Sequence, residues 1–496
     1  MTTWKACFGL AAASVLAMLT GLAAAQADVP DVPFSKIKHF VIIYGENLSF
    51  DAVFGAFPGA HGKDEWPKAA PQTDNDGSVL PRLPKARLKD EKSNGITVYL
   101  DEALTNAPFA IEDHLSKGAA TGDLVHRFYQ EQEQINGGKN DRFAAVSDAG
   151  GLAMGYYHDE ELQLWKLARE FTLADHFHHA AYGGSFLNHF WLICACTPEY
   201  KAALQEKPEV ACGTGPGGEP QLIPKRVICL DPKTGYLARK ETSPKSSLDG
   251  PPEWVNNGQV IPDEGYAVNT LQPSYEPYSD EPKLPPQKAL TIGDLLTDAG
   301  QTWGWYAGGW NNAVAGKSRA YAPPEYFQPH HQPFNYFEKF APGQKERAHL
   351  KDENDFIGAI RGGTLPEVSF WKPVGRDSMH PGYTDIWSGD RRIGEVIGLI
   401  RQSPQWKDTA IIITFDENGG TWDHVAPPKG DRWGPGVRVP TLVISPFAKR
   451  GFVDHTVYDT TAILKTLEVR FGLPSLGARD AASPDLSAAF DFSQTP

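Results

Sequence analysis

An acidic pair follows a strongly apolar stretch near the C-terminal end of this chain. Residues 410–415 are typical of a buried strand, and Asp416 and Glu417 come directly after it. Neighbouring carboxylates repel each other unless a positive charge lies between them. Their oxygens are also the ligands that hard divalent cations prefer. The pair therefore predicts a metal site at the end of a strand.

A second apolar stretch, residues 38–44, is followed after one glycine by Glu46 and Asn47. One such strand end is weak evidence, since acids often end strands or begin turns. The carboxyl ends of parallel strands meet at one edge of a sheet, where ligands bind. We therefore expect Glu46 and Asn47 to face Asp416 and Glu417 across one divalent metal ion, with Mg, Ca, Mn, Fe and Zn left open.

A candidate nucleophile, Ser185, follows Gly183 and Gly184 and precedes a predicted helix at residues 186–194. Glycines let the backbone approach a ligand closely, and a helix N-terminus favours an anion. A metal contacting the Ser185 oxygen would lower its pKa and make it a usable nucleophile. The alternative is an ordinary serine N-cap, which the sequence alone leaves open.

Histidines in loops rich in Pro or Gly form the third candidate group: His126, His330, His331 and His380. A single histidine is more often a buried hydrogen-bonded side chain, but loop positions favour function. Protonated, these rings would bind phosphate oxygens; neutral, they could transfer protons. His380 is the first candidate for the general acid, with His126 and His331 as alternatives. Because histidine titrates near ~6.5, this group predicts an acidic pH optimum.

Apolar and amphipathic segments alternate along the chain. Further buried strands are predicted at 302–307, 367–372 and 437–445, and helices within 110–134 and at 160–171, 290–299, 391–402 and 458–471. This alternation predicts an α/β fold with a mostly parallel central sheet sandwiched by helices. Such a sheet would bring both acidic strand ends to one edge.

Residues 197–290 are rich in Pro and Gly and predict an insertion stapled by disulfides, whereas residues 478–496 predict a polar tail. The cysteines near or within the insertion are Cys194, Cys196, Cys212 and Cys229. In an oxidising compartment they predict two disulfides. The first two are close in sequence, which favours pairing with the last two; a Zn site is the alternative.

Residues 1–27 predict a cleavable signal peptide, with Lys5 before the apolar residues 8–24 and a small-x-small cleavage site at 25–27. An uncleaved anchor helix is the alternative. We expect a periplasmic or secreted protein with no stable membrane anchor, and residues 28–496 as a single domain. The formal net charge is −14, without a long basic run, which argues against nucleic acid as a partner. The oligomeric state is left open.

Five segments together carry a family resemblance: residues 46–51, residues 134–141, Ser185 with Asn188, His380-Pro-Gly, and residues 416–424. They resemble the bacterial phosphoesterase family that contains secreted acid phosphatases and phospholipases C, within the alkaline phosphatase superfamily. The resemblance runs from about residue 37 to 472. It implies an alkaline phosphatase-like fold and small phosphorylated substrates.

The resemblance also implies roles for individual residues. The implied metal ligands are Glu46, Asn47, Ser185, Asp416 and Glu417, with Ser185 also the nucleophile. Asn188 and the four loop histidines would surround the phosphate. Asp423 and His424 either support the metal pair or hold the turn at Pro427, and the sequence leaves both open.

Departures from the phospholipase C pattern favour the acid phosphatase branch. Phospholipases C usually have Thr at the position of Ser185, Gln-Glu-Asn-Arg at residues 45–48, and additional C-terminal domains. We therefore expect a metal-dependent acid phosphatase that forms a phosphoserine, with a phospholipase C-type phosphodiesterase as the alternative. A non-catalytic binding protein is the third class, and it would need no nucleophile.

Overall fold

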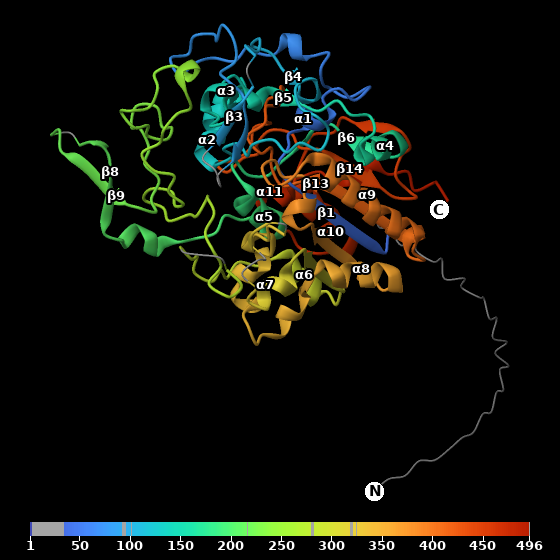
Figure 1. The fold of residues 1–496 in the computed structure, drawn as a ribbon. Coiled ribbons are helices and arrows are strands. Elements are labelled where there is room, and N and C mark those ends of the chain that lie inside the picture. The colour runs from blue at the N-terminus through green and yellow to red at the C-terminus, as the bar shows by residue number, and fades with distance from the viewer. Residues whose placement is uncertain are drawn as a thin grey trace. The chain divides into compact units, whose positions relative to one another are not determined.

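The computed structural model describes Met1 and residues 34–495, apart from residues 92–95, 101, 216, 279–281, 318–320 and 324. The predicted signal peptide lies, except for Met1, outside the described residues. Beyond residue 32 the chain forms one compact unit (Figure 1). No helix in the described part of the chain combines the length and the apolar character that a membrane span requires.

An eight-stranded sheet with the order β11-β10-β12-β1-β13-β14-β6-β15 forms the centre of the unit. The strands are β1 (His39–Gly45), β6 (Thr172–Ala174), β10 (Trp303–Ala307), β11 (Leu350–Asp352), β12 (Val368–Lys372), β13 (Thr409–Phe415), β14 (Thr441–Ile444) and β15 (Phe452–Asp454). Only β14 runs antiparallel to its neighbours. The prediction of a mostly parallel sheet is confirmed.

The pairing of β1 with β13 places the two acidic strand ends together. The strands are parallel, and Gly45 lies opposite Phe415. Their side chains are buried almost throughout, as expected for strands covered on both faces. Glu46 and Asp416 therefore leave the sheet side by side at the same edge.

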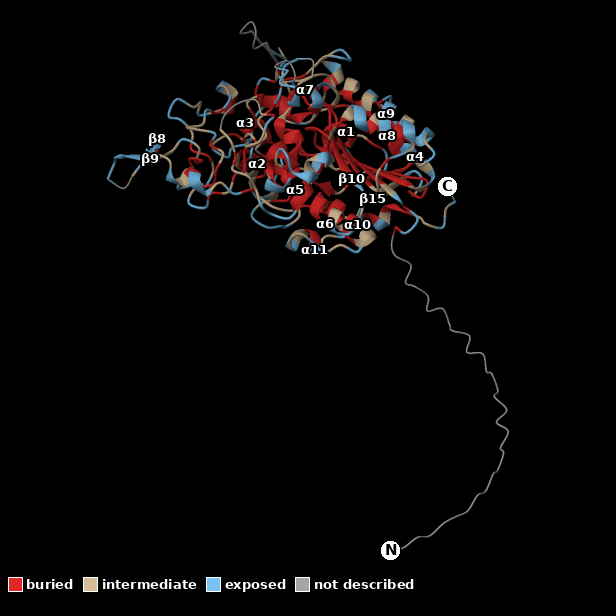
Figure 2. Cartoon of the chain, turned by 90° about the horizontal axis from the view of Figure 1, so that it is seen from below, coloured by how far each residue is buried: buried red, intermediate tan, exposed pale blue. Residues whose placement is uncertain are grey.

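Helices cover both faces of the sheet (Figure 2). One face carries α4 (Gln163–Glu170), α8 (Glu353–Gly362) and α9 (Ile386–Gln402), and the other carries α5 (Ser185–Cys194), α6 (Ile292–Asp298) and α10 (Thr461–Phe471). In α9 the buried residues Ile393, Val396 and Ile400 recur at helical spacing, and Asp385 caps its first turn.

Shorter elements surround this core: α1 (Phe50–Phe54), α2 (Phe128–Ile135), α3 (Phe143–Val146), α7 (Trp310–Val314), α11 (Ala478–Ala482), β2 (Arg87–Glu91), β3 (Ile96–Tyr99), β4 (Phe109–Ala110), β5 (Gly155–Tyr156), β7 (Phe177–His178), β8 (Pro208–Thr214), β9 (Pro220–Pro224) and β16 (Tyr458–Asp459). Of the helical stretches expected within residues 110–134, only α2 forms as an α-helix. The predicted strand at 437–445 shortens to β14.

Residues 478–495 pack against the core and do not form the expected polar tail. Leu486 and Phe490 are buried. The ring of Phe490 lies edge-on to Phe34 with 5.5 Å between centroids. Leu486, Ala489 and Phe490 supply apolar contacts at helical spacing. The rest of the segment is polar, and for this reason its composition predicts a tail.

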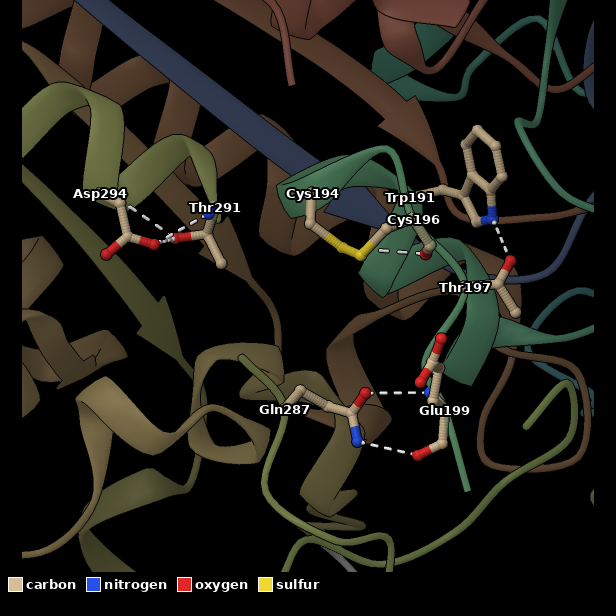
Figure 3. The surroundings of a disulfide bond; sticks show 8 residues. All are labelled: Trp191, Cys194, Cys196, Thr197, Glu199, Gln287, Thr291 and Asp294. Atoms are coloured by element: carbon tan, nitrogen blue, oxygen red, sulfur yellow. Dashed lines mark hydrogen bonds between the residues drawn. A yellow bond between two sulfur atoms is a disulfide. The ribbon is translucent and has the colours of Figure 1, made fainter. Parts of the chain in front are cut away.

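The disulfides join cysteines that are neighbours in sequence, so the predicted cross-pairing is wrong, and so is the Zn alternative. Cys194 bonds to Cys196 at the end of α5 (Figure 3). Cys212 bonds to Cys229. Ala195 adopts a left-handed conformation with a φ of 46°. This turn brings the first two Cα atoms to 5.1 Å, within the ordinary disulfide range.

The segment 197–290 forms little regular structure and extends outside the main sheet through the hairpin of β8 and β9 (Figure 1). The Cys212–Cys229 bond joins this hairpin to the rest of the segment. Other parts of the segment, including Trp254 and Asn269, line the cleft described below.

Candidate active site

Ser185 is the first residue of α5 and lines a cleft of about 590 Å³. The N-cap is Gly184, so Ser185 is not the serine cap that the sequence left open. No side chain caps this helix end, and its first N–H groups stay available to an anion. Gly183 has a φ of 91°, and a Cβ there would lie 2.5 Å from the Phe128 nitrogen. The turn before Ser185 therefore requires glycine.

Buried polar side chains hold this turn from behind. Asn188 accepts from the Ala181 N–H and donates to the Ala181 carbonyl, both at 2.9 Å. Its amide is thus used by the turn, and Asn188 does not line the cleft, contrary to the expected phosphate contact. Glu131 accepts from the Gly183 N–H and pairs with His179 at 2.8 Å. These contacts hold Ser185 in place from behind the cleft.

Oxygen atoms from both strand ends converge on the Ser185 hydroxyl. It donates toward Asn47 Oδ1 at 3.4 Å and Glu417 Oε1 at 3.5 Å, and it also contacts Asp416. Asn47 holds a left-handed φ of 68°, a strained conformation typical of functional sites. Gly419 packs so closely on it that a Cβ would lie 2.2 Å from the Asn47 carbonyl oxygen.

Glu46 takes a different position from the other expected ligands, because a lysine separates it from them. Lys372 Nζ lies 2.7 Å from Glu46 Oε1 and 3.4 Å from Asp416 Oδ2. His331 also pairs with Glu46 Oε1. Lys372 was not among the site residues predicted from the sequence. Its signal is the same as for the acids, a charged residue at the end of a buried strand.

The buried acids differ in their electrostatic surroundings. Burial opposes ionisation of Glu46, but His331 and Lys372 hold its pKa well below the usual range. Burial raises the pKa of Glu417 well above its ordinary value, and the charge of Asp416 adds to this. Among the described residues, no Lys or Arg lies within ion-pair distance of Glu417. A divalent cation beside Asn47, Asp416, Glu417 and Ser185 fits this oxygen-rich, uncompensated site.

All four predicted histidines line the cleft together with Ser185. His126 Nε2 lies 3.7 Å from Glu417 Oε1 and 3.4 Å from Asn47 Nδ2, so this ring points toward the acids. His380 stacks on Tyr383 at 3.9 Å, and its Nδ1 lies 2.5 Å from the Pro381 carbonyl oxygen. In the described part of the chain no side chain engages His380 Nε2, which leaves this nitrogen for a ligand.

Burial changes the expected protonation of two of these histidines. It lowers the pKa of His330 well below its ordinary value, and it lowers the pKa of His331. Both rings are therefore less protonated at a given pH than an exposed histidine, which weakens the argument for an acidic optimum. Another buried histidine, His189, lies behind the site; its Nδ1 hydrogen-bonds the Ser185 carbonyl at 2.7 Å. Inside a predicted helix it carried no loop signal.

A family model described as the phosphoesterase family matches residues 37–474. This chain belongs to the phosphoesterase family. The chain is 24% identical over 510 residues to phospholipase C B of Mycobacterium tuberculosis, covering 93% of this chain and 79% of that protein. It is 23% identical to the non-hemolytic phospholipase C of Pseudomonas aeruginosa, covering 92% of this chain and 57% of that protein. Family membership supports phosphoester hydrolysis as the class of reaction.

A solved structure described as a protein in the alkaline phosphatase superfamily from Vibrio parahaemolyticus is also similar. It shares 12% sequence identity, and the alignment covers 67% of this chain and 66% of that chain. The TM-score of 0.31 is too low to support a structural conclusion.

Asp423 and His424 fasten the two acidic family segments to each other. Asp423 accepts from the Asp51 N–H at 3.1 Å and pairs with Arg438 at 2.9 Å. Arg438 also pairs with Asp51 at 2.9 Å, and His424 pairs with Asp51 at 2.7 Å. Asn140, which lies in the family segment 134–141, donates to the Asp423 carbonyl at 2.8 Å. None of these described contacts reaches Ser185, so their role is to position the loops.

The replacement Arg438→Met should reduce the free energy of unfolding by about 3–5 kcal/mol, because it leaves the buried Asp51 and Asp423 without their cation. The matched control is Arg432→Met, which removes an exposed pair with Glu264 and should cost at most about 1 kcal/mol. Urea denaturation measures both. Equal losses in the two variants would contradict the importance of the buried network.

The pH dependence of the metal-free protein should report the raised pKa of Glu417. The unfolded chain loses this proton near pH ~4.3, whereas the folded protein keeps it to higher pH. The free energy of unfolding should therefore fall as pH rises between these two pKa values. Glu417→Gln removes this contribution, so its stability relative to the parent protein should increase with pH in EDTA. A difference that does not change with pH would refute the assignment.

Proposed function

We propose that this phosphoesterase hydrolyses phosphomonoesters through a phosphoserine on Ser185, with the help of one divalent metal ion. One observation carries the proposal: Ser185 begins an uncapped helix in the cleft, and its hydroxyl faces Asn47 and Glu417 at 3.4 and 3.5 Å. This arrangement combines a nucleophile, an anion-binding helix end and hard oxygen ligands at one point.

Asn47, Asp416, Glu417 and Ser185 would hold the metal ion. When bound, the ion would lower the pKa of the serine hydroxyl and offset the negative charge of the phosphate. Glu46 stays paired with Lys372 and keeps that cation beside Asp416. The metal ligand role expected for Glu46 is therefore reassigned in this proposal to positioning Lys372.

The chain's own residues account for both steps of the reaction. Ser185 releases its hydroxyl proton to solvent, and its Oγ attacks phosphorus. The bond to the leaving alcohol breaks, and His380 gives that alcohol a proton through Nε2. The N–H groups at the start of α5 and the neighbouring histidines bind the phosphoryl oxygens. Water then attacks the phosphoserine, the bond between phosphorus and Ser185 Oγ breaks, and His380 takes up a proton from the water. Ser185 Oγ regains a proton from solvent, so that free phosphate and the Ser185 hydroxyl are restored.

The walls of the cleft favour a polar leaving group. They carry charged side chains, including Arg127, Asp123 and Asp148. Phospholipase C activity is the second candidate, and the names of the relatives favour it. Apolar residues such as Trp254 and Val268, which also line the cleft, could contact the glycerol side of a lipid. The same nucleophile would serve both reactions.

Export is also part of the proposal, and it rests on residues 1–27. The exported protein should begin at Asp28. N-terminal sequencing or intact mass of protein recovered from the periplasm or the medium measures this directly. Protein that retains residues 1–27 would refute cleavage.

Ser185→Ala should abolish nearly all turnover while leaving stability close to that of the parent protein, because it removes only the nucleophilic oxygen. Rates on an aryl phosphate and on phosphatidylcholine should be measured side by side with mass analysis for phosphate on Ser185. Faster hydrolysis of the aryl phosphate supports the phosphatase proposal, whereas faster release of phosphocholine supports the second candidate. Turnover retained by Ser185→Ala would overturn both.

His380→Ala should slow hydrolysis of an alkyl phosphate by roughly 10²- to 10⁴-fold, since its leaving group needs a proton. The loss should be much smaller for p-nitrophenyl phosphate, whose leaving group is stable without one. The matched variant His126→Ala should slow both substrates to a similar extent, because that ring faces the acids. Equal losses on the two substrates for His380→Ala would remove it as general acid.

A further inference from the structure

Three histidines surround a buried aspartate away from the Ser185 cleft. His61 Nδ1 and His176 Nε2 lie 2.7 Å apart, and each ring has a ligand atom within 4.8 Å of an Asp175 carboxylate oxygen. His455 Nδ1 lies 2.9 Å from Asp175 Oδ2, and its ring stacks on that of His61 with 4.5 Å between centroids. None of these four residues lines the cleft.

The strands of the main sheet determine where this cluster lies, as they do for the acids near Ser185. Asp175 follows β6, and His455 follows β15; the two strands are parallel neighbours, with Ala174 opposite Asp454. β6 runs parallel to β13, because both are antiparallel to β14. The cluster therefore lies at the same carboxyl edge of the sheet as the Ser185 site, where ligands bind in such folds.

The third element is the loop after α1, which delivers His61. The loop closes on itself through a 2.7 Å hydrogen bond from the Lys63 N–H to the Gly55 carbonyl. The His61 N–H donates to Asp175 Oδ2 at 2.8 Å. These two hydrogen bonds of the backbone hold the His61 ring against His176.

The charges around the cluster leave room for a cation. Arg438 donates to the carbonyl oxygens of His61 and Asp175, each at 2.8 Å. Asp51 and Asp423 already pair with this guanidinium. The Asp175 carboxylate is therefore a negative charge beyond those that Arg438 neutralises.

We propose that His61, His176 and Asp175 form a second metal site, for a borderline transition-metal dication such as Zn²⁺. Two imidazole nitrogens with one carboxylate are a ligand set for Zn²⁺ and its neighbours, and differ from the all-oxygen set near Ser185. His455 contacts the carboxylate and orients it, as partners of metal ligands commonly do. A fourth position remains for water.

Binding requires only a small rearrangement. Zn–N bonds of about 2.0–2.1 Å at tetrahedral angles separate two ligand nitrogens by roughly 3.3 Å, so the two rings must part by about half an ångström. The hydrogen between His61 Nδ1 and His176 Nε2 must move to the other nitrogen of its own ring as the metal binds, because both lone pairs are then donated. The rings of His61 and His176 are only partly buried, so the ion can enter from solvent.

A metal ion bound by these residues would connect the loop after α1 to the edge of the sheet. α1 follows Glu46 and Asn47 within a few residues. A metal at this second site would stabilise the loop that continues from the Ser185 site without taking part in the reaction.

Zn²⁺ stoichiometry tests the proposal. EDTA-treated full-length protein is equilibrated with Zn²⁺ and dialysed, and bound metal per chain is measured by mass spectrometry. The parent protein should hold one Zn²⁺ more than His61→Ala/His176→Ala. The control His114→Ala/His158→Ala, which removes two histidines outside both sites, should match the parent. Equal stoichiometry in the parent and the His61/His176 variant would overturn the site, whatever the metal near Ser185 does.

A second measurement needs no variant and so holds even if the double replacement does not fold. Zn²⁺ should protect His61 and His176 of the parent protein from diethylpyrocarbonate, as read by peptide mass spectrometry, and should leave labelling of His114 and His158 unchanged. Mg²⁺ should give no protection. Labelling of His61 and His176 that Zn²⁺ does not change would refute the proposal.

Discussion

The in-register parallel pairing of β1 with β13 is the constraint on which the rest of the site depends. It sets Gly45 beside Phe415, so the next residues of two segments distant in sequence must leave the sheet at one point. A shift of one residue would turn the alternating side chains of one strand to the wrong face. Because both strands are buried on both sides, such a shift would also disrupt packing against two layers of helices, and the register is strongly specified.

That geometry concentrates negative charge, which the fold must then offset. Glu46, Asp416 and Glu417 are all buried, and Lys372 on the neighbouring strand β12 is the one lysine that reaches any of them in the described structure. Lys372 neutralises the charge of Glu46 but does not pair with Glu417. This difference distinguishes Glu46, whose carboxylate is already paired with Lys372, from the carboxylates that are available to an ion. In the proposed reaction, this difference would place the metal ion beside Ser185 rather than beside Glu46.

Much of this arrangement could be predicted because it depends on local patterns. The apolar runs before Glu46 and Asp416 specified two strands, and two glycines marked the turn before Ser185. Lys372 carried the same signal but was read only as the end of a strand. His189 could not be predicted as a residue of the site, because it lies inside a helix, where a histidine has no distinctive spacing. The disulfides were mispaired because the left-handed conformation of Ala195, which closes the Cys194–Cys196 bond, leaves no mark in residue type.

The origin of the cleft walls has a consequence for how such an enzyme can diverge. The proposed metal ligands and nucleophile lie at strand ends and on α5, whereas Trp254, Asn257, Gln259 and Asn269 reach the cleft from the segment 197–290. That segment adds no strand to the main sheet. Residues of the segment such as Ile261, Val268 and Leu271 are buried in the core. Its exposed parts can change with little cost to that core, so substrate selectivity can evolve separately from the chemistry. Related chains with different substrate preferences need not differ at the sheet edge that carries Asp416 and Glu417.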